Sequence, residues 1–119
     1  MVIVKSQIHT KRVYETPTKD DGTRVLVDRL WPRGVSKEKA RIDLWLKEIA
    51  PSDALRNWFG HREERWEAFN KKYRKELEGK KELIERLSTI KKKGALTLLF
   101  AAKDAEKNNA VVLKNILRS

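Results

Sequence analysis

Unbroken runs of apolar residues mark two strands in the interior of a sheet. Residues 24–28 contain Val25-Leu26-Val27, and residues 95–101 contain a longer apolar run. A continuous run, in place of an alternation of apolar and polar residues, is typical of strands buried on both faces of a parallel sheet. Residues 2–8, which are rich in β-branched side chains, predict a further strand at the start of the chain.

Between these strands the hydrophobic spacing changes to that of helices. Ser52 is a natural N-cap for a short helix that extends to Phe59. From residue 62 onward, apolar residues recur at spacings of three and four and predict an amphipathic helix, which Gly79 interrupts. The members of this stripe are Trp66, Phe69, Tyr73 and Leu77.

Two more helices complete the pattern. The first has an apolar face formed by Leu83, Ile84, Leu87 and Ile90, and Gly94 ends it just after three lysines. Asp104 is predicted to cap the last helix, whose core face comprises Val112, Leu113, Ile116 and Leu117. Parallel strands need crossover connections, and the predicted helices supply them. The pattern therefore predicts a single three-layer α/β domain over residues 1–119, with a mostly parallel sheet of three to four strands covered by helices.

Composition limits the chemistry that this domain can perform. The 119 residues include no cysteine and two histidines, His9 and His61. Disulfides, thiolate chemistry and a metal site are therefore not expected, and no cofactor is predicted. No apolar run is long enough to span a membrane and no signal peptide is recognised, so we expect a cytoplasmic protein. Charged residues make up 38% of the chain, which is typical of heat-adapted proteins.

The positive charge is concentrated in one part of the chain. Residues 71–93 carry 10 basic and 4 acidic side chains, which is +6 of the net charge of +11. One hypothesis is therefore a nucleic-acid-binding surface on the predicted helices of this segment. The alternative is an ordinary solvent-exposed helix face. The residues of the first hypothesis are Lys71, Lys72, Lys75, Lys91, Lys92 and Lys93.

Charged residues also follow the two buried strands. In open α/β sheets, ligands bind beyond the carboxyl ends of the strands. Asp28, Arg29 and Arg33 follow one strand, and Lys103 and Asp104 follow the other. If the two strands are adjacent, these groups favour a small anion such as a nucleotide or another phosphorylated metabolite. The alternative is a structural ion-pair cluster beneath the loop.

Aromatic residues and one imidazole lie near the same positions. Trp31 and Trp58 are candidates for stacking on a planar ligand. The alternative for Trp31, which we prefer, is a hydrophobic plug that fastens its loop to the core. Asp28 or His61 is the candidate for moving a proton if a reaction occurs. His61 is otherwise a cap of the preceding helix. A third hypothesis is an interaction subunit that exposes an apolar patch around Trp45 and Leu46.

Several long motifs resemble the YeaO-like branch of the family called domain of unknown function 488. The resemblance runs from about Lys11 to Leu117. The residues that carry it are Asp28-Arg29-Leu30-Trp31-Pro32-Arg33-Gly34, Trp58-Phe59-Gly60-His61, Arg65-Trp66, Phe69, Tyr73-Arg74, Glu76-Leu77, Leu98-Leu99-Phe100-Ala101-Ala102-Lys103-Asp104, Asn108 and Ala110-Val111-Val112-Leu113.

The resemblance implies a small cytoplasmic α/β protein without an established activity. Longer relatives in the wider family are similar around the last strand but place a Cys and a Glu where this chain has Phe100 and Ala102. They also place Cys-His-Arg where this chain has Asn108-Asn109-Ala110. A thiol or zinc mechanism is therefore not expected here. The polar residues that remain at this end are Asp28, Arg29, Arg33, His61, Lys103, Asp104 and Asn108.

Overall fold

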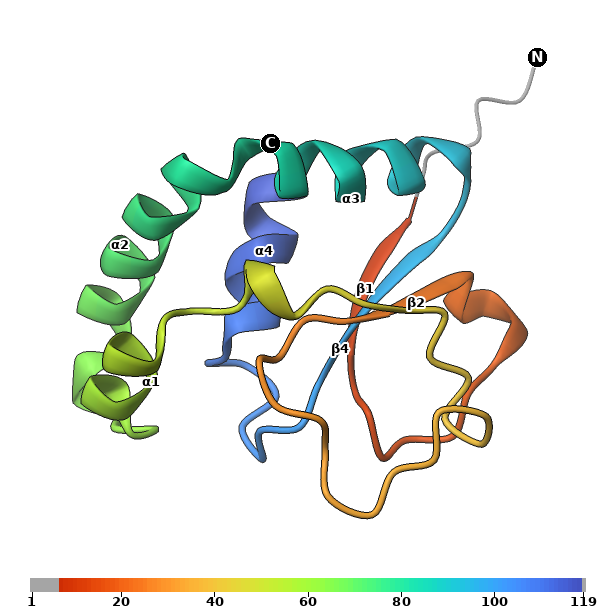
Figure 1. The fold of residues 1–119 in the computed structure, drawn as a ribbon, viewed down its shortest axis with the longest axis horizontal. Coiled ribbons are helices and arrows are strands. Elements are labelled where there is room, and N and C mark those ends of the chain that lie inside the picture. The colour runs from red at the N-terminus through yellow and green to blue at the C-terminus, as the bar shows by residue number, and fades with distance from the viewer. Residues whose placement is uncertain (1–6, 119) are drawn as a thin grey trace.

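A four-stranded parallel sheet organises the molecule. The computed structural model describes residues 7–118. Its strands are β1 (Ile8–Arg12), β2 (Thr23–Leu26), β3 (Leu44–Trp45) and β4 (Leu96–Phe100). They are hydrogen-bonded in the order β1-β4-β2-β3, and every pair is parallel. The α/β class and the parallel sheet expected from the sequence are confirmed (Figure 1).

The two strands with continuous apolar runs are neighbours in the middle of this sheet. Val25 of β2 lies opposite Leu98 of β4, and Leu26 lies opposite Leu99. β1 contains Ile8 of the strand expected at residues 2–8 and continues beyond it to Arg12. The part of that prediction at residues 2–6 lies outside the described residues. β3 was not predicted as a strand, since two residues are too few to show a period.

The helices follow the predicted apolar stripes closely. They are α1 (Asp53–Phe59), α2 (Trp66–Leu77), α3 (Lys81–Lys93) and α4 (Asn109–Arg118). The hydroxyl of Ser52 accepts a hydrogen bond from the Leu55 amide at 3.2 Å, so the predicted cap of α1 is present. Within residues 7–118, no helix is long and apolar enough to cross a membrane.

The predicted cap of α4 is wrong. Asp104 lies five residues before the helix, and its carboxylate accepts hydrogen bonds from the amides of Glu106 and Lys107 in a preceding turn. Asn108 caps the helix instead, because its side-chain oxygen accepts from the Val111 amide at 3.1 Å. Asp and Asn have similar preferences for caps and for turns, so the sequence did not separate the two positions.

Different structures cover the two faces of the sheet. Val25 and Leu98 belong to the main core, which contains the buried residues of all four helices. Leu26 and Leu99 point to the opposite face, where residues from the loop 28–43 pack on them in a second, smaller core. In Figure 1 this loop, drawn in orange and yellow, runs away from α2 and α3. The layers are therefore helices, sheet and loop, and the loop brings residues 28–33 past the carboxyl end of β2.

Candidate functional site

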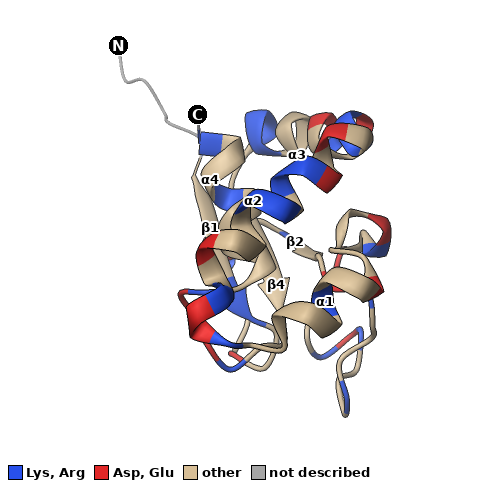
Figure 2. Cartoon of the chain, turned by 90° about the vertical axis from the view of Figure 1, so that its left-hand side faces the viewer, with Lys and Arg blue, Asp and Glu red and all other residues tan. Residues whose placement is uncertain are grey.

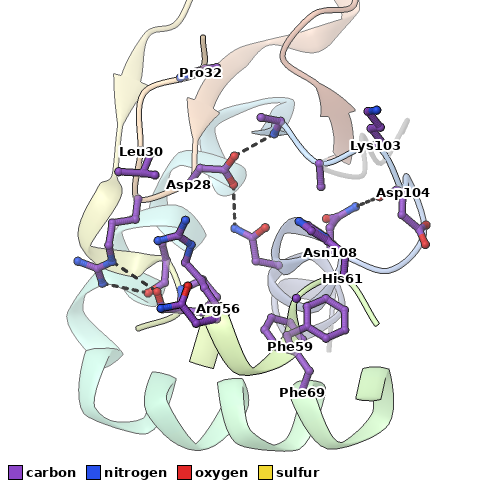
Figure 3. Close-up of a pocket in the computed structure, with 18 of the residues that line it drawn as sticks. Asp28, Leu30, Pro32, Arg56, Phe59, His61, Phe69, Lys103, Asp104 and Asn108 are labelled. Carbon is purple, nitrogen blue, oxygen red and sulfur yellow. Dashed lines mark hydrogen bonds between the residues drawn. The ribbon is translucent and has the colours of Figure 1, made fainter. Parts of the chain in front are cut away.

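A pocket of about 840 Å³ opens at the carboxyl ends of β2 and β4. The segments after both strands, the beginning of α4, and α1 with the turn that follows it all contribute to its wall. Figure 3 shows these side chains around one space, with Phe59 and Phe69 on the side nearest α2. The lining comprises residues 28–33, 50–51, 56–57, 59–61, 69, 101–104 and 108–109.

Asp28 joins the two strand ends across the inner part of this pocket. One carboxylate oxygen accepts a hydrogen bond from the Ala101 amide at 2.9 Å, and the other accepts from the Asn109 side-chain amide at 3.2 Å (Figure 3). Burial raises the pKa of the Asp28 carboxyl above its ordinary value, and these two hydrogen bonds offset only part of that effect. Asp28 therefore holds β4 and α4 in place and keeps a less acidic carboxyl in the pocket wall.

Four cationic side chains line the pocket and differ in how firmly they are held. Arg29 lies 3.4 Å from the carbonyl oxygens of Ala50 and Pro51, and Arg56 forms a 2.8 Å ion pair with Asp53. Arg33 and Lys103 are exposed. Neither of these two side chains has a polar partner among residues 7–118. Arg33 and Lys103 are consequently the cations most available to a ligand.

His61 reaches the pocket because the chain turns sharply after α1. Gly60 ends the helix with a φ of 51°, and His61 follows with a φ of 57°. Two successive left-handed residues reverse the chain, and histidine is among the residue types that tolerate this conformation. The imidazole is exposed and lies 5.9 Å from the Phe59 ring, measured between centroids.

The two tryptophans predicted to stack on a ligand lie in different places. Trp31 lines the pocket, but its indole N–H donates to the Val35 carbonyl at 2.9 Å and its ring packs on Trp45. Trp58 is outside the pocket lining. The cations of Arg65 and Lys72 lie over its ring, 4.8 and 5.0 Å from the centroid. Trp31 therefore both plugs the loop and borders the pocket.

The predicted apolar patch around Trp45 and Leu46 does not form. Leu46 is buried in the main core, and only Trp45, which is 36% exposed, reaches the surface. The Trp45 indole donates to the Asp28 carbonyl at 2.7 Å, and the Lys47 ammonium lies over its ring. These contacts attach β3 to the loop that borders the pocket.

The basic segment 71–93 forms parts of α2 and α3, away from the pocket. Figure 2 shows Lys and Arg along both helices with Asp and Glu between them. Lys91 donates to the Leu117 carbonyl, and Lys72 covers Trp58. Four of the six predicted nucleic-acid contacts remain exposed without such a contact: Lys71, Lys75, Lys92 and Lys93.

Some pocket residues were not singled out from the sequence. Arg56, Asn57 and Phe59 enter from α1, and Asn109 enters from the beginning of α4. The signal that could have found them is their closeness in sequence to His61 and Asn108, which were selected. In residues 7–118, no group of three or more His, Cys, Asp or Glu side chains is arranged to hold a metal ion.

Comparisons with known proteins match this chain over nearly its whole length. The model of a family described as "Inactive DUF488-N3 subclade" covers residues 7–119. The chain belongs to this family. It is 45% identical to the uncharacterized protein YeaO of Escherichia coli (strain K12) over 112 residues. These residues are 94% of this chain and 97% of that protein. The resemblance to the YeaO-like branch is thereby confirmed.

A mycobacterial relative is similar over slightly more of the chain. The uncharacterized protein Rv3073c of Mycobacterium tuberculosis (strain ATCC 25618 / H37Rv) is 36% identical over 116 residues, which are 98% of each chain. No solved structure matches the chain significantly. The relatives extend the family assignment without supplying an activity.

Proposed function

We propose that this protein binds a small anionic ligand, such as a nucleotide or another phosphorylated metabolite, in the pocket at the carboxyl ends of β2 and β4. One observation carries the proposal: four cationic side chains and two carboxylates line the same cavity. Among residues 7–118, the Arg33 and Lys103 side chains have no polar partner, so they supply the charge for the ligand. A volume of about 840 Å³ is sufficient for a nucleotide.

Binding without turnover is the version of this proposal that we favour. Its support is the word "inactive" in the family description, together with the residues at the strand ends. The positions at which longer relatives place Glu, Cys and His correspond here to Ala102, Asn108 and Asn109, and all three line the pocket. In this version Asp28 holds the pocket wall in position and does not transfer protons, and His61 contacts the ligand.

Calorimetric titration with AMP, inorganic pyrophosphate and a sugar phosphate tests the proposal, with sodium chloride as the ionic-strength control. The double variant Arg33→Gln with Lys103→Gln is expected to lose about tenfold or more in affinity. The double variant Lys92→Gln with Lys93→Gln removes the same charge from an exposed part of α3 and should keep wild-type affinity. Equal loss in both variants, or no binding of any probe, would refute the proposal.

The second candidate function is nucleic-acid binding through α2 and α3. The exposed side chains of Lys71, Lys75, Lys92 and Lys93 support it. It predicts an affinity for duplex or single-stranded probes that falls steeply with salt and is lost in the double variant of Lys92 and Lys93. We also propose a cytoplasmic location, because nucleotides and phosphorylated metabolites are concentrated in that compartment.

A further inference from the structure

The side-chain amide of Asn109 has a fixed orientation at the inner end of the pocket. Its nitrogen donates one hydrogen bond to the Val27 carbonyl at 3.0 Å and another to the Asp28 carboxylate at 3.2 Å. Both of these partners accept hydrogen bonds, so the NH₂ group must face them and its two hydrogens are both used. The amide oxygen therefore points elsewhere.

The remaining hydrogen-bonding group of this side chain is its amide oxygen, which is an acceptor. Asn109 lines the pocket, and its oxygen has no hydrogen-bond donor among residues 7–118. Within residues 7–118, the buried side-chain polar atom without a partner is Nη2 of Arg24, so the Asn109 oxygen is not fully buried. The neighbouring Asp28 oxygens each accept one hydrogen bond and keep capacity for a second. The inner end thus presents acceptors from Asp28 and Asn109.

The two ends of the pocket consequently differ in chemistry. Asp28 and Asn109 are half-buried acceptors at the inner end, whereas Arg33 and Lys103 are exposed cations. Rings of Trp31 and Phe59 line the space as well and suit a planar apolar body. An anion that is bound through the cations would place its other end against the acceptors.

We propose that Asp28 and Asn109 select a nucleotide whose base carries an amino group, which donates hydrogen bonds to these acceptors while the phosphate contacts Arg33 and Lys103. The inference deepens the proposed function and rests on it. A site built to pair with an N–H group rejects a ligand that lacks the group, because its own buried polar atoms are then left unpaired.

Paired titrations with AMP and purine riboside 5′-monophosphate test this selection. The second probe differs from AMP in having hydrogen in place of the amino group. We expect AMP to bind about tenfold or more tightly, which corresponds to about 1.4 kcal/mol. Equal binding of both probes would overturn the selection and leave the proposed anion site standing. Binding of pyrophosphate with neither nucleotide would also overturn the selection alone, whereas failure of every probe would overturn both.

The variant Asp28→Asn adds a test of the orientation argument. The Ala101 amide still requires an acceptor, so the new side chain turns its oxygen toward Ala101 and its NH₂ toward Asn109. The Val27 carbonyl still holds the Asn109 NH₂ group in place, so an NH₂ group at position 28 replaces one of the acceptors at the inner end of the pocket. AMP and purine riboside 5′-monophosphate should then bind about equally, whereas Asn115→Ala, at an exposed position of α4 outside the pocket lining, should retain the preference for AMP.

A second variant keeps the test valid if Asp28→Asn does not fold. Asn109→Ala removes the acceptor and should also abolish the preference for AMP, with folding verified by circular dichroism. If either folded variant keeps the wild-type ratio of affinities, the assignment of Asp28 and Asn109 as the selecting groups is wrong.

Discussion

Replacing Asp21 by Asn should destabilise the protein strongly at neutral pH and much less in acid. Asp21 is buried in the turn that precedes β2, and its carboxylate pairs with Lys11 and Arg24. The backbone amide and the hydroxyl of Thr18 also donate to it, at 3.0 and 2.9 Å. Arg24 is itself only 2% exposed, so its guanidinium depends on this carboxylate for a counter-charge.

The pKa of Asp21 sets the size and sign of the effect. Burial alone would raise this pKa, but the hydrogen bonds from Thr18, Lys11 and Arg24 lower it from 3.8 to about 2. A difference of this size is worth about 2 kcal/mol of folding free energy. Because the pKa is lower in the folded state, this stability is present above about pH 4 and is lost as the pH falls through about 2.

Urea unfolding, followed by tryptophan fluorescence, measures the effect at about pH 7 and about pH 2. At neutral pH the variant should lose about 3 kcal/mol or more, because Arg24 keeps its buried charge without a partner. At about pH 2, the difference in free energy of unfolding between wild type and variant should be smaller by about 2 kcal/mol. Asp20→Asn alters the exposed neighbouring aspartate and serves as the control. A difference in free energy of unfolding that is the same at both pH values would refute the reasoning.

Three further substitutions test single features of the fold, each by the free energy of urea unfolding. Gly22→Ala should destabilise by more than about 1 kcal/mol, because φ is +62° and the new Cβ would lie 2.2 Å from the Ala95 carbonyl oxygen; an unchanged stability would contradict this geometry. Tyr73→Phe should cost about 1 to 3 kcal/mol, because the buried Ile49 carbonyl loses a 2.7 Å hydrogen bond. Ser52→Ala should cost about 1 kcal/mol through loss of the α1 cap. An unchanged stability of Tyr73→Phe or of Ser52→Ala would show that water replaces the lost hydrogen bond.

The sequence predicted the interior of the fold better than its periphery. The continuous run at Val25-Leu26-Val27 identified a strand that is covered on both sides, and the structure places Leu26 and Val25 in different cores. Helix ends were predicted where one residue type has a clear preference, as at Ser52 and Gly94. β3 was missed because its two residues become a strand only by pairing with β2, a tertiary contact that no local pattern contains.

The candidate site was predicted from strand ends, and its helical side was therefore incomplete. Asp28 and Lys103 were expected to lie near one another because parallel strands end at the same edge, and both line the pocket. Nothing local distinguished Asn57 from Trp58. Consecutive residues of a helix differ by about 100° in direction, so Asn57 faces the pocket while Trp58 lies beneath Arg65 and Lys72.

The hydrogen bonds of Asp28 connect the pocket wall to three elements of the fold. Asp28 bonds to the first residue after β4 and to the first residue of α4, and the carbonyl of the same residue accepts from Trp45 of β3. Removing the Asp28 carboxyl would leave the Ala101 amide without this partner and would free the beginning of α4. Folding therefore requires the same polar network that shapes the pocket wall. The side chains of Ala102 and Asn108 take no part in these bonds, so this network does not depend on them.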